Sequence, residues 1–329
     1  MAPGTPGFIP VLHAATDSRP DEIDTLFAAE AVAAALHERG YEAEIVGLSP
    51  DLGGLEALPS RRPLVVFNLV DAVNGDGRLA AIVPARLDAL GLRYTGARTS
   101  AWLDTLSKVG TKLKLAHARL PTPSWSADGA GLDPDAHVIV KPVWEHGSLG
   151  IDATSVMRGA AARQAIAERT ARWQTEHFAE TFVEGREFNV SLLEGPDGIQ
   201  VLPIAEILFE GFTGSAAQIV GYDAKWSPDS VAYIGTPRRF GLEQAEPALA
   251  GVLADRARAC WLLFGISGYA RVDFRVDPAG APFILEINMN PCLTPDAGFA
   301  SAALEGGLTF PDLIGSIAAV PLGPLRATA

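Results

Sequence analysis

Over the first hundred residues, short apolar segments alternate with longer segments whose apolar residues recur at helical spacing. The short segments predict strands at residues 8–14, 43–48 and 63–70, with a further edge at 92–96. The longer segments predict helices at residues 22–39 and 79–90, which end at Gly40 and Gly91. This order predicts a doubly wound open α/β sheet. Polar loops follow its strands at residues 17–19 and 68–78, where such sheets bind ligands, although ordinary loop polarity would look the same.

The pattern changes in the middle of the chain. It predicts a helix at residues 102–118, a strand at 138–140, a helix at 158–174 and a strand ending at 182–183. The loop that follows Lys141 contains two glycines, Gly147 and Gly150, whose backbone amides could approach phosphate oxygens, and Ser148 could donate from its side chain. This loop could form a mobile lid. A purely structural turn between strand and helix would contain similar residues.

The last part of the chain, residues 185–329, contains a second group of strands. A strand is predicted at residues 188–193, a further segment follows at 204–209, and helices are predicted at 243–264, ended by Gly265, and at 311–319. No internal repeat is present.

Residues 271–288 predict a β-hairpin with one polar face. The turn has Pro278 at its second position and Gly280 at its fourth, which suits a type I geometry. Pairing Val276 with Ala281 would place Arg271 opposite Glu286. Alternation then predicts a core face and a cleft face. The core face comprises Val272, Phe274, Val276, Phe283, Leu285 and Ile287, and the cleft face comprises Arg271, Asp273, Glu286 and Asn288.

The cleft face suits a hard cation. Two carboxylates and a carboxamide are oxygen ligands of the kind that bind Mg²⁺, which leaves its other positions to water and phosphate oxygens. Asp273, Glu286 and Asn288 are therefore candidate metal ligands, and the site predicts a bound nucleotide. The alternative is an edge hairpin whose polar face is only solvated.

Composition limits the classes of partner. The chain has 329 residues, 39 acidic and 26 basic, and a net charge of −13, which argues against nucleic acid or an anionic membrane surface as the main partner. Two cysteines, Cys260 and Cys292, predict neither a disulfide framework nor a cysteine-rich zinc site. We found no signal segment and no apolar run of roughly 20 residues. We therefore expect a cytoplasmic protein that acts on small molecules.

Six motifs occur in the order found in ATP-grasp ligases, and the chain resembles the D-alanine:D-alanine ligases among them. They are Lys108, Lys141-Pro142, the 145–150 loop, the 180–188 segment, Lys225, and the pair Arg271-x-Asp273 with Glu286-x-Asn288. The resemblance implies an α/β ATP-grasp fold of three subdomains. These are an N-terminal domain at 1–99, a central lid subdomain at 100–184 and a C-terminal subdomain at 185–329. It is also compatible with a homodimer.

The resemblance implies a role for each motif. Lys108, Lys141 and Lys225 look like the lysines that reach the ATP phosphates, and the loop of Glu145, His146, Gly147, Ser148 and Gly150 looks like the phosphate lid. Glu180, Thr181, Phe182 and Val183 resemble the segment that contacts adenine, and Glu187 resembles the ribose acceptor. Arg271, Lys225 and Ser148 would act on the transferring phosphoryl group. The cofactors implied are ATP and Mg²⁺.

The departures from the family fall on the substrate side. His146 enters the lid loop, Trp226 stands where the family usually has tyrosine, and Ala297 replaces a serine that holds a substrate carboxylate. Losing a buried hydrogen-bond partner costs about 1–3 kcal/mol. Asn290, Cys292 and Asp296 lie nearby and are candidate substrate contacts. Asp296 would favour an acceptor with less negative charge at that end, unless it only caps the next helix.

These motifs predict an ATP-dependent carboxylate–amine ligase. It would form an amide bond through an acylphosphate on amino-acid or peptide-like substrates that are not both D-alanine. Three alternatives stay open: an ordinary D-alanine:D-alanine ligase, an ATP-grasp kinase, and a catalytically silent nucleotide-binding regulator. Direct chemistry by His146 or Cys292 is less favoured than a solvated loop histidine and an unreactive thiol.

Overall fold

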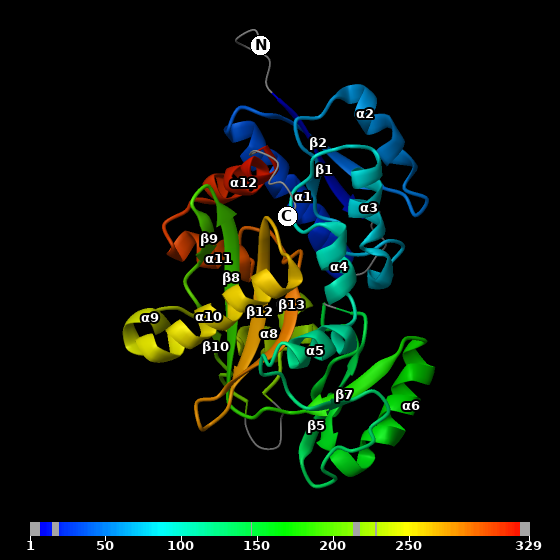
Figure 1. Ribbon diagram of the computed structural model, residues 1–329, viewed down its shortest axis with the longest axis vertical. Helices are drawn as coiled ribbons and strands as arrows, with labels where there is room; N and C mark the ends of the chain where they lie inside the picture. The colour runs from blue at the N-terminus through cyan, green and yellow to red at the C-terminus, as the bar shows by residue number, and fades with distance from the viewer. Residues whose placement is uncertain (1–6, 15–19, 146, 213–217, 228, 323–329) are drawn as a thin grey trace.

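Three β-sheets make up the frame of the protein. The computed structural model describes residues 7–14, 20–145, 147–212, 218–227 and 229–322, which excludes the predicted loop at 17–19. In Figure 1 the sheet near the N-terminus lies at the top, the largest sheet in the middle and the third at the lower right. The architecture is mixed α/β, as predicted.

The N-terminal sheet is parallel and has the strand order β2-β1-β3. Its elements are β1(Phe8–Ala14), α1(Pro20–Glu38), β2(Glu42–Leu48), α2(Leu58–Arg61), β3(Phe67–Asn68) and α3(Ile82–Ala89). The predicted strand–helix–strand order is confirmed, and both glycines that end the predicted helices have positive φ, 82° at Gly40 and 65° at Gly91. The third strand is shorter than predicted, because only Phe67 and Asn68 pair with β1. Val66 forms one isolated bridge on the other side, to Tyr94.

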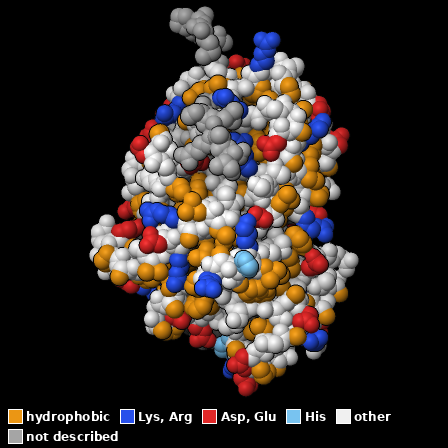
Figure 2. All heavy atoms as spheres, viewed as in Figure 1, with side chains coloured by type: hydrophobic (Ala, Val, Ile, Leu, Met, Phe, Trp, Pro, Cys, Tyr) orange, Lys and Arg blue, Asp and Glu red, His pale blue; other side chains and the backbone are white. Residues whose placement is uncertain are grey.

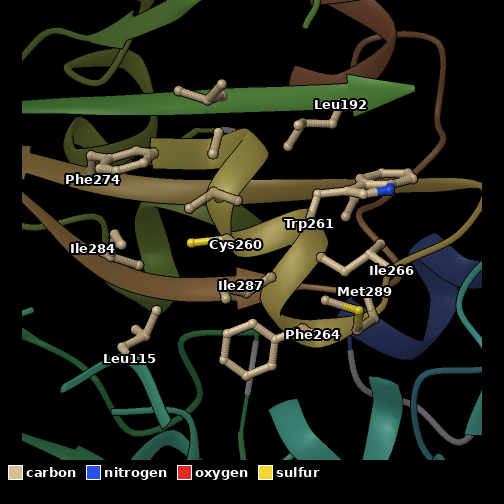
Figure 3. Close-up of a cluster of buried hydrophobic side chains, with 14 of the residues drawn as sticks. Leu115, Leu192, Cys260, Trp261, Phe264, Ile266, Phe274, Ile284, Ile287 and Met289 are labelled. Atoms are coloured by element: carbon tan, nitrogen blue, oxygen red, sulfur yellow. The ribbon is translucent and has the colours of Figure 1, made fainter. Parts of the chain in front are cut away.

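The middle sheet is antiparallel and has the order β11-β10-β8-β12-β13, with β9 on β8. Its strands are β8(Arg186–Gly195), β9(Gly198–Val201), β10(Ala205–Ile207), β11(Arg238–Arg239), β12(Tyr269–Val276) and β13(Pro282–Asn288). The short helices α7(Tyr222–Trp226) and α8(Val231–Ile234) precede β11. Helix α10(Pro247–Phe264) packs Cys260, Trp261 and Phe264 against the apolar face of the sheet (Figure 3).

The third sheet is antiparallel with the order β4-β7-β5-β6. It contains β4(Trp125–Ser126), β5(His137–Pro142), β6(Val156–Arg158) and β7(His177–Thr181), and helix α6(Ala162–Trp173) packs on it. The predicted helix at 158–174 therefore starts later, because residues 156–158 extend the sheet. Helices α4(Thr99–Thr105) and α5(Lys108–His117) connect this part to the N-terminal sheet.

Two predicted helices are each interrupted. The helix expected at 102–118 is divided at Ser107, whose hydroxyl accepts a hydrogen bond from the Gly110 amide at 3.1 Å and caps α5. The helix expected at 243–264 is divided into α9(Leu242–Ala245) and α10. Pro247 begins α10, and the residue before a proline is driven out of helical geometry. Both breaks can be explained from the sequence, by the capping residue Ser107 and by Pro247.

The hairpin register differs from the prediction. A bulge interrupts the pairing after Asp273, so Asp273 lies opposite Glu286 and Arg271 lies opposite Asn288. The extra residue is Leu285. It turns Phe283 and Leu285 out of the core and places Ile284 there. The polar face nevertheless keeps its four predicted members, because the bulge lies before Glu286 along β13.

The C-terminal helices return to the N-terminal sheet. Helices α11(Gly298–Glu305) and α12(Phe310–Ala319) share one apolar core with β1 and α1, so the red and blue ends of the chain lie side by side in Figure 1. On the face seen in Figure 2, acidic and basic side chains are interspersed. Within the described ranges, no helix has both the length and the apolar character needed to cross a membrane.

Candidate active site

A cavity of about 610 Å³ lies where the three sheets meet. It is lined by residues of α1, of the loop after β3, of β5 and β7, of the hairpin and of the segment that enters α11. Most residues singled out from the sequence line it: Lys108, Lys141, Glu145, Gly147, Ser148, Glu180, Thr181, Phe182, Val183, Glu187, Lys225, Trp226, Arg271, Asp273, Glu286, Asn288, Asn290, Cys292, Asp296 and Ala297. Gly150 lies outside the lining, and His146 lies outside the described residues.

The polar face of the hairpin forms the centre of this cavity. Arg271 donates from Nε and Nη2 to the two carboxylate oxygens of Asp273, at 2.7 and 2.8 Å. Burial alone would lower the pKa of Arg271, but the Asp273 carboxylate raises it above its ordinary value. Asn189 on β8 donates to Asp273 Oδ1 at 2.8 Å. Lys108 Nζ lies 3.4 Å from Glu286 Oε2 and also contacts the Glu145 carbonyl. Each carboxylate thus has a basic neighbour.

The oxygen donors on this face fit a magnesium ion held jointly by protein and phosphate. Asp273 and Glu286 are directly opposite in the sheet, and the Asn288 side-chain oxygen accepts from the Asn290 amide at 3.0 Å, which fixes its orientation. Among the described residues, no group of three or more His, Cys, Asp and Glu side chains could hold a metal. Two carboxylates and a carboxamide would leave coordination positions for phosphate oxygens, as Mg²⁺ commonly requires.

Glu180 is buried between two lysines. Its carboxylate lies 2.5 Å from Lys112 Nζ and 2.7 Å from Lys141 Nζ, and both Glu180 and Lys112 side chains are 1% exposed. Burial alone would raise the pKa of Glu180, but the two ammonium charges hold it below its usual value. Burial also lowers the pKa of Lys112. Lys141 thus reaches the cavity from a fixed position.

Glu187 is held by Arg275, a residue that the sequence analysis did not assign to the site. Arg275 donates from Nε to Glu187 Oε2 at 2.9 Å, contacts the Gln218 carbonyl, and stacks 5.2 Å from the centre of the Phe182 ring. The guanidinium therefore links Glu187 to the segment at 181–183. Arg275 follows Arg271 and Asp273 at alternate positions of β12, and this spacing could have revealed it.

Lys112 was also missed. It follows Lys108 by four residues, so the two side chains lie on one face of α5. Lys112 Nζ also contacts Thr122 Oγ1 at 2.8 Å. Its spacing of four residues from Lys108 on a predicted helix could have identified it.

The 145–150 loop is tied to α7 and the residues before it. Ser148 donates to the Val220 carbonyl at 3.0 Å, and Trp226 Nε1 donates to the Gly147 carbonyl at 2.8 Å. Ser148 has φ of 62° and Gly150 has φ of 74°. In this structure the side chains of Ser148 and Trp226 thus hold the loop. Neighbouring Lys225 is half-buried, and burial lowers its pKa.

The segment from Asn290 to Ala297 closes one end of the cavity. Tyr269 donates to Asn290 Oδ1 at 2.5 Å, and the Cys292 thiol donates to Asp24 Oδ2 at 2.9 Å. Ala297 occupies the N-cap of α11, which has no side-chain cap. The alternative in which Asp296 caps this helix is therefore wrong, because the helix begins one residue later than a cap at Asp296 requires.

We expect Cys292 to be chemically inert at neutral pH. Burial and the Asp24 carboxylate raise the pKa of its thiol to about 12, and burial alone raises that of Cys260 to about 12. Alkylation with iodoacetamide at pH 8 should leave both cysteines unmodified in the folded protein and modify both in urea, as read by intact mass. Rapid labelling of folded Cys292 would contradict this environment.

The arrangement of sheets around a cavity lined by lysines and by the polar hairpin defines the chain as a protein of ATP-grasp fold. The crystal structure of the D-alanine–D-alanine ligase from Bacillus anthracis complexed with ATP superposes with a TM-score of 0.73 at 20% identity, over 96% of this chain and 97% of that one. The family model described as D-ala D-ala ligase C-terminus matches residues 135–319.

Relatives by sequence cover nearly the whole chain. The D-alanine–D-alanine ligase of Moorella thermoacetica is 30% identical over 91% of this chain and 95% of its own, and that of Desulforudis audaxviator is 31% identical over 88% and 91%. An uncharacterized protein of Sinorhizobium fredii is 32% identical over 88% of this chain and 85% of its own. The chain belongs to the D-alanine–D-alanine ligase family and is an ATP-grasp ligase that forms carbon–nitrogen bonds.

Proposed function

We propose that the protein binds Mg²⁺-ATP, phosphorylates a substrate carboxylate and joins the resulting acylphosphate to an amine, releasing ADP and phosphate. The observation that carries this proposal is the single polar face of Arg271, Asp273, Glu286 and Asn288 inside the cavity. A silent regulator has no use for an arginine at the position of phosphoryl transfer. Such an arginine stabilises charge that develops only during the reaction.

In this proposal the nucleotide lies between the lid sheet and the hairpin. Lys108, Lys141 and Lys225 bind its phosphates, and Glu187 accepts from the ribose hydroxyls. The segment of Glu180, Thr181, Phe182 and Val183 contacts adenine. The buried pairs made by Glu180 and Arg275 support it, because they fix Lys141 and Glu187 before nucleotide binds. The ATP bound to the structurally similar ligase of Bacillus anthracis supports the same cofactor.

Asp273, Glu286 and Asn288 would hold Mg²⁺, which supplies charge neutralisation on the phosphate oxygens. Arg271 and Lys225 would stabilise the phosphoryl group as it moves to the carboxylate. The backbone amide of Cys292 and Arg271 would then donate to the oxyanion formed when the amine attacks. The 145–150 loop, with Gly147 and Ser148, would exclude water from the acylphosphate.

The division into subdomains at 1–99, 100–184 and 185–329 follows the three sheets and is part of the proposal. Each sheet lies within one of these ranges.

An ADP-release assay over pairs of amino acids and dipeptides tests the reaction class. We expect ADP only when a carboxylate and an amine substrate are both present. ADP formed with a single hydroxyl substrate would identify a kinase. Absence of ADP with every substrate, despite nucleotide binding, would identify a regulator.

We further propose that the substrates are not two D-alanines. Ala297 offers no hydroxyl at the start of α11, and Trp226 adds an apolar ring beside Gly147. With D-alanine as the only amino acid, we expect kcat/KM well below about 10⁴ M⁻¹s⁻¹, the lower end of ordinary enzymes. A value at or above it would identify an ordinary D-alanine–D-alanine ligase.

A further inference from the structure

Two adjacent arginines form β11, and they face different surroundings. Arg239 Nη2 lies 2.6 Å from Glu206 Oε2, outside the cavity. Arg238 lines the cavity. In the part of the chain that the structure describes, Arg238 makes no ion pair, and its one hydrogen bond goes from Nη1 to the Asp296 backbone carbonyl at 3.0 Å. A guanidinium has five N–H donors, so most of its donor capacity remains for a ligand.

The position of Arg238 is fixed by the start of α11. A Cβ at residue 298 would lie only 3.1 Å from Arg238 Nε, so Gly298 leaves room for the guanidinium over the first turn of this helix. The Asp296 carbonyl holds the same group from the preceding turn. Ala297 between them contributes no polar side-chain atom. The positive charge at this end of the cavity therefore comes from β11.

We propose that Arg238 binds the carboxylate of the amine substrate, the carboxylate that is not phosphorylated. This inference rests on the proposed ligase function and adds the residue that selects an acceptor with a free carboxylate near its amine. It replaces the expectation that the acceptor carries less negative charge here. That expectation considered Asp296 and Ala297 without the arginine from β11.

Charge and placement support this assignment. A planar guanidinium matches a carboxylate through two parallel hydrogen bonds. Burial and the nearby Arg271 charge lower the pKa of Arg238 by more than Asp296 raises it, so an added anion would relieve an unfavourable pair of positive charges. The phosphorylated carboxylate must instead lie beside Glu286 and Asn288. Arg238 contacts the 296–298 segment, so the two carboxylates would occupy different ends of the cavity.

Binding to the nucleotide-loaded enzyme tests the inference without turnover. The wild-type protein with Mg²⁺ and the non-hydrolysable analogue AMP-PNP would be titrated with D- and L-amino acids and with the matching carboxamides. We expect the best amino acid to bind at least about 10-fold more tightly than its carboxamide, and Arg238→Gln to lower its affinity about 10- to 100-fold. Carboxamide affinity should change little, and Arg238→Lys should recover part of the loss.

Arg239→Gln is the matched control, since it removes an arginine from the same strand outside the cavity, and Glu206 keeps Arg186 at 2.7 Å. Its affinities should equal those of the wild type. Equal binding of every amino acid and its carboxamide to wild type, or equal effects of Arg238→Gln and Arg239→Gln, would overturn the inference. Failure of the ADP-release screen would refute the ligase proposal separately, because the AMP-PNP titration needs no reaction.

Discussion

Glu286→Gln is expected to lower ATP turnover by at least about 10²-fold, the scale of removing one preorganised electrostatic contact from a transition state. The substitution keeps the shape of the side chain and removes the charge opposite Asp273. Lys108 keeps its contact with the Glu145 carbonyl, so the fold should persist. ADP release at saturating Mg²⁺, together with thermal unfolding, measures both effects.

Glu246→Gln is a suitable control for the Glu286 variant. Glu246 also pairs with a basic side chain, 2.8 Å from Arg186 Nη1, but it lies outside the cavity. We expect its turnover to match that of the wild type. If Glu286→Gln retained half of wild-type turnover at saturating Mg²⁺, the metal assignment would be wrong.

The polar face of the hairpin could be predicted from the sequence, but the pairing register of its two strands could not. Strict alternation assigns Arg271 and Asp273 to one face of β12, and the structure keeps them there. The register depends on one extra residue, Leu285. Nothing in its apolar side chain distinguishes a bulge from a regular strand position. Helix breaks at Ser107 and Pro247, by contrast, follow from local capping and proline geometry that the sequence contains.

The side chains that support the candidate site were harder to predict than those within it. Lys112 pairs with Glu180, which lies 68 positions later in the chain, and Asn189 reaches Asp273 only because β8 and β12 are neighbours. Such pairs depend on strand order, which periodicity does not determine. Arg238 enters the cavity because β11 forms the edge of the sheet. Its neighbour Arg239 has identical chemistry and lies outside.

Glu180→Gln is expected to destabilise the protein by about 3–5 kcal/mol, the usual effect of leaving one member of a buried ion pair without its partner. Lys112 would keep Thr122 Oγ1 and the neutral glutamine oxygen as possible hydrogen-bond acceptors, but it would lose the carboxylate charge that lies 2.5 Å away. Burial already lowers the pKa of Lys112 below its ordinary value of 10.5, so the unfolded chain binds this proton more tightly than the folded one. The stability of the variant should therefore rise relative to wild type as pH increases from 7 towards 10. Urea unfolding at several pH values measures this.

Combining Glu180→Gln with Lys112→Met should restore part of the lost stability. The double variant removes the buried ammonium together with its counter-ion, and methionine fills a similar apolar volume. Lys141, whose side chain is 14% exposed at the cavity, can keep its charge in contact with water. Lys112→Met alone should cost less than Glu180→Gln, because Glu180 still pairs with Lys141 at 2.7 Å. A double variant whose loss equals the sum of the single losses would show that Lys112 and Glu180 act independently, contrary to the buried pair.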